Sequence, residues 1–374
     1  MQVEALEVVK KEKKANLKEG RESNIELLRI VSTLFIFVYH YMIAGAISEV
    51  YVYTNNKIVA LFLSTEGQVG VNIFFLITGY FMINSKFKIR KLLKLFLQVF
   101  FYSVGLTLLE LYTSQLSFKD MDIAPFLKPI TQNIYWFATV YAYVYIFTPF
   151  LNKMIKGLGK RGCEVFLIFF GVLLSILPTF FNKYFMYSEL RWGIYMYVLG
   201  AYINLFKIEF RNKKTGLLIA IFHPICIFLL EILVIFLDKK FGIHISKDKC
   251  ICMYSIYSIV GAVGYFLFFK SLKIKQSKII NYISKVSFVT FLISGHQLYQ
   301  RHFWFLDCRT DLVINSPIYV FLLHMILCVI GIYILAIITE FLRVNLLEKP
   351  LFRILKIKPL DRFLNKFDNW INVI

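Results

Sequence analysis

Charged residues and cysteine motifs are scarce in this sequence. Asp, Glu, Lys and Arg make up 18% of its 374 residues, whereas soluble domains contain about 25%. Its six cysteines form no CxxC pair and stand in no cluster with histidine at the spacing of zinc ligands. These absences argue against an ordinary soluble enzyme, predict no metal site, and favour cysteines that are buried as apolar thiols.

A secretion signal and a strand pattern are also absent. Residues 1–22 mix Lys and Glu with no apolar core and no small-residue cleavage site, so they do not resemble a signal peptide. We expect them to form a charged, solvated cytoplasmic tail. No alternation of apolar and polar residues with a period of two recurs along the chain, which argues against a membrane barrel of strands.

The chain is instead rich in apolar residues. Hydrophobic residues make up 58% of it, and the mean hydropathy is +0.65. A helix that crosses a bilayer needs about 20 mostly apolar residues. We therefore predict an all-α polytopic membrane bundle over 23–345, followed by a basic cytoplasmic tail over 346–374. The bundle would hold about ten transmembrane helices, at 25–47, 67–84, 92–112, 134–151, 163–181, 191–206, 216–237, 250–269, 280–299 and 317–341.

The net charge of +20 is spread unevenly over this layout. With the N-terminus inside, 29 of the 43 basic residues fall in the tails and loops on the cytoplasmic side, and 11 fall in the opposite loops. Loops rich in Lys and Arg tend to stay in the cytoplasm. The pattern predicts a multi-pass plasma-membrane protein with both termini in the cytoplasm. Its charge then faces the lipid bilayer and cytosolic anions, with no nucleic acid as partner.

Arg29 and His40 are ionisable residues inside the first predicted span. They are eleven residues apart, which is ~16 Å along a helix and close to three turns, so their side chains share a face. Ionisable groups inside a membrane are costly and are functional candidates. One interpretation is that Arg29 holds an anionic cofactor while His40 reacts deeper in the bundle. The other is that Arg29 reaches the lipid headgroups and His40 only packs.

Other predicted spans carry further polar residues. Asn72 and Thr78 permit hydrogen bonds between packed helices. Arg90 and Lys94 are four residues apart and share a helix face at the inner boundary, where they suit either a phosphate clamp or ordinary positive flanks. The sequence leaves open the roles of the remaining intramembrane candidates, which are His296, His324, Glu110 and Glu231.

Together, these motifs resemble the membrane acyltransferase-3 family, whose members O-acylate sugars and other acceptors, often cell-surface polysaccharides. The Arg-x10-His signature of its first helix matches Arg29 and His40 with the spacing intact. The stretch 69–80 is similar to its second motif, with Asn72 where many members have Asp. Its ninth helix often carries a histidine where this chain has Ser294. The basic cluster of its third helix is similar to Arg90, Lys91 and Lys94.

The resemblance implies an O-acyltransferase with cytosolic acyl-CoA, commonly acetyl-CoA, as donor. The acceptor would be a hydroxyl of a cell-surface glycan or of a lipid-linked sugar. His40 would act as the base, a task that suits a group with a pKa of ~6.5, either by direct attack of the acceptor or through an acyl-histidine. Arg29 would assist catalysis and, with Arg90, Lys91 and Lys94, bind the donor phosphates.

The residues expected to line the cavity are Asn72, Thr78, Trp136 and His324. For each of them, a purely structural role is the alternative. A transporter or flippase for a polysaccharide precursor is the alternative function. Such transporters often contain broken helices in matched halves, and the sequence has no internal duplication of that kind.

Overall fold

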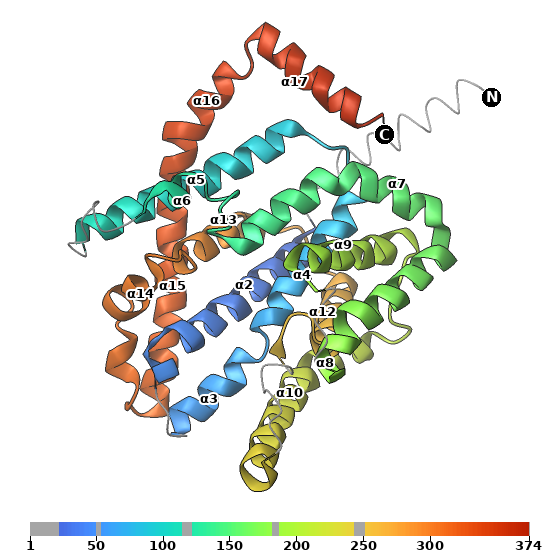
Figure 1. Cartoon of the computed structure of the whole chain (residues 1–374). Coiled ribbons are helices and arrows are strands. Elements are labelled where there is room, and N and C mark those ends of the chain that lie inside the picture. The colour runs from blue at the N-terminus through green and yellow to red at the C-terminus, as the bar shows by residue number, and fades with distance from the viewer. Residues whose placement is uncertain (1–21, 50–53, 114–121, 182–186, 243–250, 374) are drawn as a thin grey trace.

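The computed structural model describes residues 22–49, 54–113, 122–181, 187–242 and 251–373, so nearly all of the predicted N-terminal tail lies outside it. The described residues form helices and turns without a strand, which confirms the all-α class. Figure 1 shows that α2 (Ser23–Ala44) and α4 (Gly67–Met82) run through the middle of the bundle. Around them lie α3 (Asn55–Ser64), α5 (Ile89–Thr113), α7 (Trp136–Gly171), α8 (Leu177–Phe181), α9 (Glu189–Leu205), α10 (Lys213–Phe241), α12 (Ile256–Ser271), α13 (Lys278–Ser294) and α15 (Ile318–Arg343).

Six helical stretches among the described residues are long and apolar enough to cross a membrane. They confirm a membrane protein of several spans, whereas the expected count of about ten is not established by this criterion. Three of the expected spans are shorter helices, since α9, α12 and α13 have 17, 16 and 17 residues. The six stretches are 23–44, 55–82, 89–113, 136–181, 214–241 and 318–354.

The stretch 136–181 combines two of the expected spans. It has 46 residues, which is ~69 Å of helix and about twice the thickness of a bilayer core. Gly159 interrupts it with a φ of 64° and a ψ of −172°, a positive-φ conformation that is essentially restricted to glycine. The bend lies between the two apolar segments predicted from the sequence, so this stretch has the length and the turn for two crossings.

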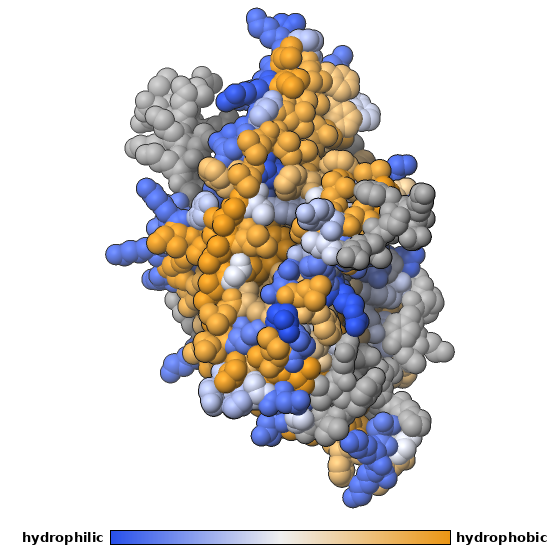
Figure 2. All heavy atoms as spheres, turned by 90° about the vertical axis from the view of Figure 1, so that its left-hand side faces the viewer, coloured by the Kyte–Doolittle hydropathy of each residue, from blue (hydrophilic) through white to orange (hydrophobic). Residues whose placement is uncertain are grey.

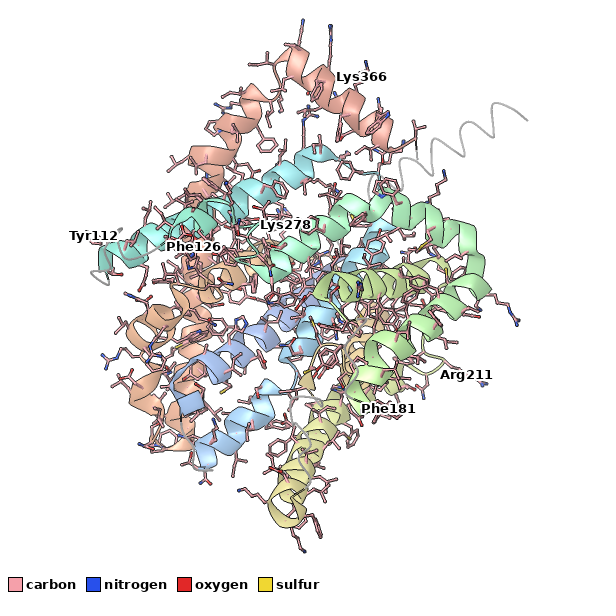
Figure 3. The ribbon with its side chains drawn as sticks, viewed as in Figure 1. Tyr112, Phe126, Phe181, Arg211, Lys278 and Lys366 are labelled. Carbon is pink, nitrogen blue, oxygen red and sulfur yellow. The ribbon has the colours of Figure 1, made fainter. Side chains whose placement is uncertain are left out.

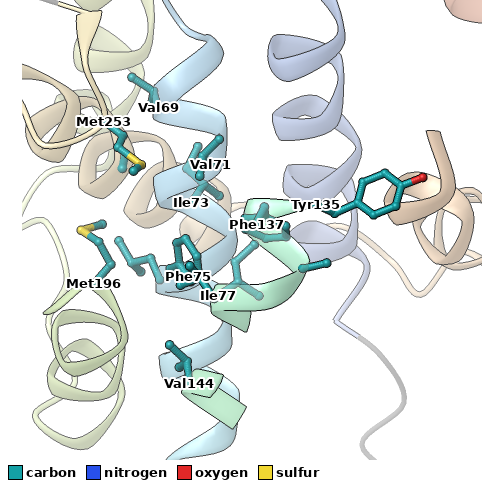
Figure 4. Close-up of a cluster of buried hydrophobic side chains, with 14 of the residues drawn as sticks. Val69, Val71, Ile73, Phe75, Ile77, Tyr135, Phe137, Val144, Met196 and Met253 are labelled. Atoms are coloured by element: carbon teal, nitrogen blue, oxygen red, sulfur yellow. The ribbon is translucent and has the colours of Figure 1, made fainter. Parts of the chain in front are cut away.

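Helices α4 and α9 approach each other unusually closely, through glycine. A Cβ on Gly79 would lie 1.9 Å from the Tyr197 carbonyl oxygen, and one on Gly200 would lie 2.0 Å from the Leu76 carbonyl oxygen. Small residues let helix backbones touch where lipid provides no hydrophobic driving force. The close approach buries the apolar residues of α4 around Phe75, as Figure 4 shows.

Segments that the charge pattern assigned to one side of the membrane are bonded to one another. The Asn24 amide, at the start of α2, donates to the Phe269 and Lys270 carbonyls at the end of α12. The Asn152 amide donates to the Met82 carbonyl at the end of α4. At the opposite end, the Asn56 amide donates to carbonyls of 313–316. At these three contacts, segments that the charge pattern assigns to the same side lie together.

The predicted tail at 346–374 is mostly helical where it is described. Helix α15 continues through η5 (Val344–Glu348) into α16 (Lys349–Ile354), and α17 (Lys358–Ile371) lies across the start of α5 (Figure 1). Asp368 Oδ1 accepts the Ile89 N–H at 2.7 Å. The first N–H groups of a helix have no partner within it, and a carboxylate also complements the helix dipole there. Helix α17 thus caps α5, which explains why this segment is ordered against the bundle.

The outer surface of the helices is apolar. Along α15, exposed residues include Leu323, Leu327, Ile334 and Phe341, which are 53–63% exposed. Figure 2 shows hydrophobic residues over much of the face that this helix helps to form. In Figure 3, Tyr112 and Phe181 extend from the ends of α5 and α8, and Lys366 points away from the bundle. An apolar surface of this extent fits contact with lipid.

Candidate active site

His40 faces a cavity of about 220 Å³ between α2, α4, α7 and α13, which we call the His40 cavity. Its lining is mostly aromatic and aliphatic, with a few polar side chains from each helix. Pockets of this composition bind small organic groups. The polar and aromatic residues that line it are Thr33, Phe37, Tyr39, His40, Gln68, Phe74, Trp136, Phe137, Ser287, Phe288, Thr290, Phe291 and Ser294.

The His40 ring is held by aromatic neighbours rather than by hydrogen bonds. Its ring centre lies 6.0 Å from that of Tyr39 and 6.3 Å from that of Phe291. Its Nδ1 is buried and has no hydrogen-bond partner within the described part of the chain. A buried polar atom without a partner is unusual in a protein. A ring nitrogen in this state is available to take a proton from a bound group.

Arg29 faces a second cavity of about 400 Å³, which we call the Arg29 cavity. It lies where the starts of α2 and α5 meet α13 and the end of α15. Five basic and two acidic residues line it, so its surface favours an anion. The charged residues are Arg29, Lys91, Lys94, Lys285, Glu340, Arg343 and Glu348.

Two of these five cations are already paired. The Arg343 guanidinium donates to both oxygens of Glu340 at 2.8 Å and to Glu348 at 2.7 Å. Lys94 Nζ lies 2.7 Å from Glu348 Oε1. Arg29, Lys91 and Lys285 form no ion pair with any carboxylate in the described residues, and Arg29 Nε is buried without a hydrogen-bond partner. The three unpaired cations give the cavity its net positive charge.

The two cavities follow one face of α2. Arg29 lines the first, and Thr33, Ile36 and His40 line the second, in steps of four, three and four residues that return to the same side of a helix. The structure therefore places Arg29 and His40 as their spacing predicts. Thr78 lines the Arg29 cavity and Trp136 lines the His40 cavity.

Three of the other predicted residues lie elsewhere. Arg90 is outside both linings, because its guanidinium donates to Asp361 and Asn365 of α17. The Asn72 side chain is fully buried and bonds to Met253 and Trp192, at 2.7 Å each. His324 Nδ1 lies 2.7 Å from the Tyr41 hydroxyl, on another face of α2. Asn72 and His324 therefore line neither cavity.

The structure also assigns partners to candidates that the sequence left open. His296 Nδ1 accepts the Tyr299 N–H at 3.0 Å, and its Nε2 lies 3.1 Å from the Ser103 carbonyl. This histidine thus joins α5 to the turn after α13. Glu110 Oε2 lies 3.1 Å from His302 Nδ1. Glu231 is buried in α10 and lines neither cavity.

Lys285 and Tyr141 line the Arg29 cavity although neither was among the predicted site residues. Lys285 carried a signal of its own, because it is an ionisable residue inside a predicted span. The residue type of Tyr141 gave no such signal, because tyrosine is frequent in this chain. Only the tertiary structure, in which α13 packs on α2 and α7 faces α2 across the cavity, brings these residues to the same cavity as Arg29.

Comparison with known proteins gives one match. A family model for an acyltransferase domain, Acyl_transf_3, covers residues 22–337. No curated protein and no solved structure matches the chain. The matched region begins at α2, just ahead of Arg29, and reaches into α15, so it contains most of both cavities.

Proposed function

Because the chain belongs to the acyltransferase-3 family, we propose that it is an integral membrane O-acyltransferase that uses cytosolic acyl-CoA. The acyl group would be acetyl, and the acceptor a hydroxyl of a cell-surface glycan or of its lipid-linked precursor. The observation that carries this proposal is the arrangement along α2. An anion-binding cavity at Arg29 adjoins a second cavity in which His40 has an unpartnered ring nitrogen.

The donor would bind at the Arg29 cavity through its phosphates. Arg29, Lys91 and Lys285 have no carboxylate partner among the described residues, so binding a phosphate breaks no existing ion pair. Hydrogen bonds from a guanidinium or an ammonium to phosphate are charge-assisted and strong. Lys94 also lines this cavity, but a bound phosphate would compete with Glu348 for its ammonium group.

The acceptor would bind at the His40 cavity. Trp136 offers a flat apolar surface, and Gln68, Ser287 and Thr290 offer groups that bond to hydroxyls. The cavity is otherwise apolar, which suits an acceptor with a lipid portion as well as a sugar. Under this proposal, the cavity opens away from the side that carries α17.

His40 would act as general base and then as general acid. Its unprotonated nitrogen takes the proton of the acceptor hydroxyl as the hydroxyl oxygen attacks the thioester carbonyl. A carbon–oxygen bond forms, the carbon–sulfur bond breaks, and the departing thiolate takes the proton from His40. The products are an O-acyl ester and free CoA, and His40 is regenerated. Direct attack is preferred, and an acyl-histidine would be detected as a covalent adduct in the absence of acceptor.

The first test replaces His40 and uses His324 as a matched control. His40→Ala is expected to lower glycan O-acylation by about 100-fold or more, the usual contribution of a positioned acid–base group. His324→Ala removes a histidine that lines neither cavity and should keep most of the activity. Mass spectrometry of surface glycans, at equal protein levels, measures both. Full acylation with His40→Ala would refute the assignment of His40 as the base. If His40→Ala instead abolished glycan export and left acylation unchanged, the result would favour a transporter.

A further inference from the structure

Three side chains line both cavities, and all three are phenylalanines. Phe74 comes from α4, Phe137 from α7 and Phe288 from α13. The Phe137 ring centre lies 5.9 Å from that of Phe74 and 6.4 Å from that of Phe288. These are contact distances for aromatic rings. The three rings, which we call the phenylalanine wall, therefore separate the space at Arg29 from the space at His40.

The wall lies on the path that the reaction requires. This step rests on the proposed function, in which the donor phosphates bind at Arg29 and the acyl group reacts at His40. Arg29 and His40 are ~16 Å apart along α2. The arm that carries the thioester must then pass between the three rings to bring the acyl group to the reacting nitrogen.

The three rings differ in how firmly they are held. Phe137 is 8% exposed and contacts Phe75 and Phe291 at ring-centre distances of 5.0 and 5.7 Å. Figure 4 shows it beside α4 within this buried cluster. Phe74 and Phe288 are only partly buried, and each borders empty space on both sides. They have room to change rotamer, whereas Phe137 is fixed by its neighbours.

We propose that Phe74 and Phe288 close against Phe137 as a gate, and that this gate determines which acyl groups reach His40. A narrow unbranched group such as acetyl passes after a small movement of the two rings. A branched acyl group requires a wider opening and is selected against. The gate would thus set specificity for the acyl group without touching the phosphates that anchor the donor.

Two other residues provide controls. Phe81 lines only the Arg29 cavity, and Ile43 lines only the His40 cavity. Replacing either one by alanine enlarges a single cavity and removes none of the three rings of the wall. An effect of the wall itself is therefore separable from an effect of added volume.

The experiment uses membrane vesicles that carry the full-length protein with their cytoplasmic face outward. Radiolabelled acetyl-CoA or isobutyryl-CoA is added, and label in the glycan fraction is counted. The wild-type protein should prefer acetyl. Phe288→Ala and Phe74→Ala should each raise the ratio of isobutyryl to acetyl transfer about tenfold or more, the scale on which a pocket discriminates a methylene group. Phe81→Ala and Ile43→Ala should leave that ratio within about twofold.

A second variant tests the gate by enlarging one of its side chains instead of removing it. Phe288→Trp should lower acetyl transfer while the Kd of the purified protein for acetyl-CoA stays within about twofold. The gate is refuted if Phe288→Ala and Phe81→Ala change the ratio equally, or if Phe288→Trp weakens donor binding as much as transfer. If acetyl labelling does not depend on the protein at all, the proposed function fails, which is a different result from unchanged specificity in an active enzyme.

Discussion

Cations around the Arg29 cavity differ chiefly in whether they already have a carboxylate partner. Lys94 and Arg343 share Glu348, and Arg90 bonds to Asp361 outside the cavity. Arg29 and Lys285 have no such partner in the part of the chain that the structure describes. An unpaired cation at a cavity can give its full charge-assisted hydrogen bonds to an incoming phosphate, whereas a paired one must first give up an ion pair.

Donor affinity should therefore fall most when an unpaired cation is neutralised. Arg29→Gln and Lys285→Gln are each expected to raise the Kd for acetyl-CoA about tenfold or more, since a hydrogen bond to a charged group contributes about 1.5–3 kcal/mol. Lys94→Gln should have a smaller effect. Lys278→Gln, two turns from Lys285 on the same helix and outside the cavity, is the control. Isothermal titration of purified protein measures these values, and an unchanged Kd with Arg29→Gln would remove the donor site from this cavity.

At the scale of helices, the site depends on α4 being held between α2 and α9. Helix α4 contributes Phe74 and Thr78 to the cavities, and its opposite face meets α9 at Gly79 and Gly200. Any widening of the α4–α9 contact would move the side chains through which α4 lines the two cavities. Helix α17 plays a comparable part for α5, because its Asp368 accepts the N–H of Ile89, the first residue of α5. Asn372, just after α17, accepts the N–H of Phe87, just ahead of α5.

A methyl group at the α4–α9 contact should separate the two helices. Gly79→Ala places a Cβ against the Tyr197 backbone, which cannot rotate away as a side chain can. We expect a loss of about 1–3 kcal/mol in stability, as overpacking usually causes. Gly105→Ala, in α5, is the control, because a Cβ there meets no atom within 4 Å. Thermal unfolding of both variants in detergent is the measurement, and equal stability would contradict the close contact.

The whole molecule has two chemically different ends, and the proposed orientation in the membrane rests on this difference. Segments that carry most of the basic residues bond to one another at the end where α2, α5 and α13 begin. Helix α10 joins the two ends, with Arg211 exposed just before it and Gly242 exposed just after it. Under the proposed orientation, the two flanks of α10 lie on opposite sides of the bilayer.

Short epitope tags beside α10 test the proposed orientation and the plasma-membrane location together. A tag inserted after Arg211 should bind antibody only in permeabilised cells. A tag after Gly242, where no atom lies within 4 Å of an added Cβ, should bind antibody on intact cells. The reverse pattern would place the basic end outside and would remove cytosolic acyl-CoA as the donor. Equal binding at both tags would refute a crossing by α10.

The shared helix face of Arg29 and His40 was predictable because its signal is local. The eleven-residue spacing places Arg29 and His40 on one face wherever α2 is helical, and the apolar runs make it helical. Asn72, Arg90 and His324 were not predictable in this way. Their partners Met253, Asp361 and Tyr41 are remote in sequence, by 181, 271 and 283 residues. A local sequence pattern does not determine which distant polar group becomes the hydrogen-bond partner of a given residue.

The sequence by itself determined the helical membrane class, the family, and the shared face of Arg29 and His40, because hydrophobicity and helical periodicity act over a few residues. Only the tertiary structure decided which cations remain unpaired and which rings close the space between the two cavities. Phe74, Phe137 and Phe288 belong to three helices, and each is unremarkable among the 39 phenylalanines of the chain. They become a wall because α4, α7 and α13 converge on one face of α2, and that convergence depends on packing across the whole bundle.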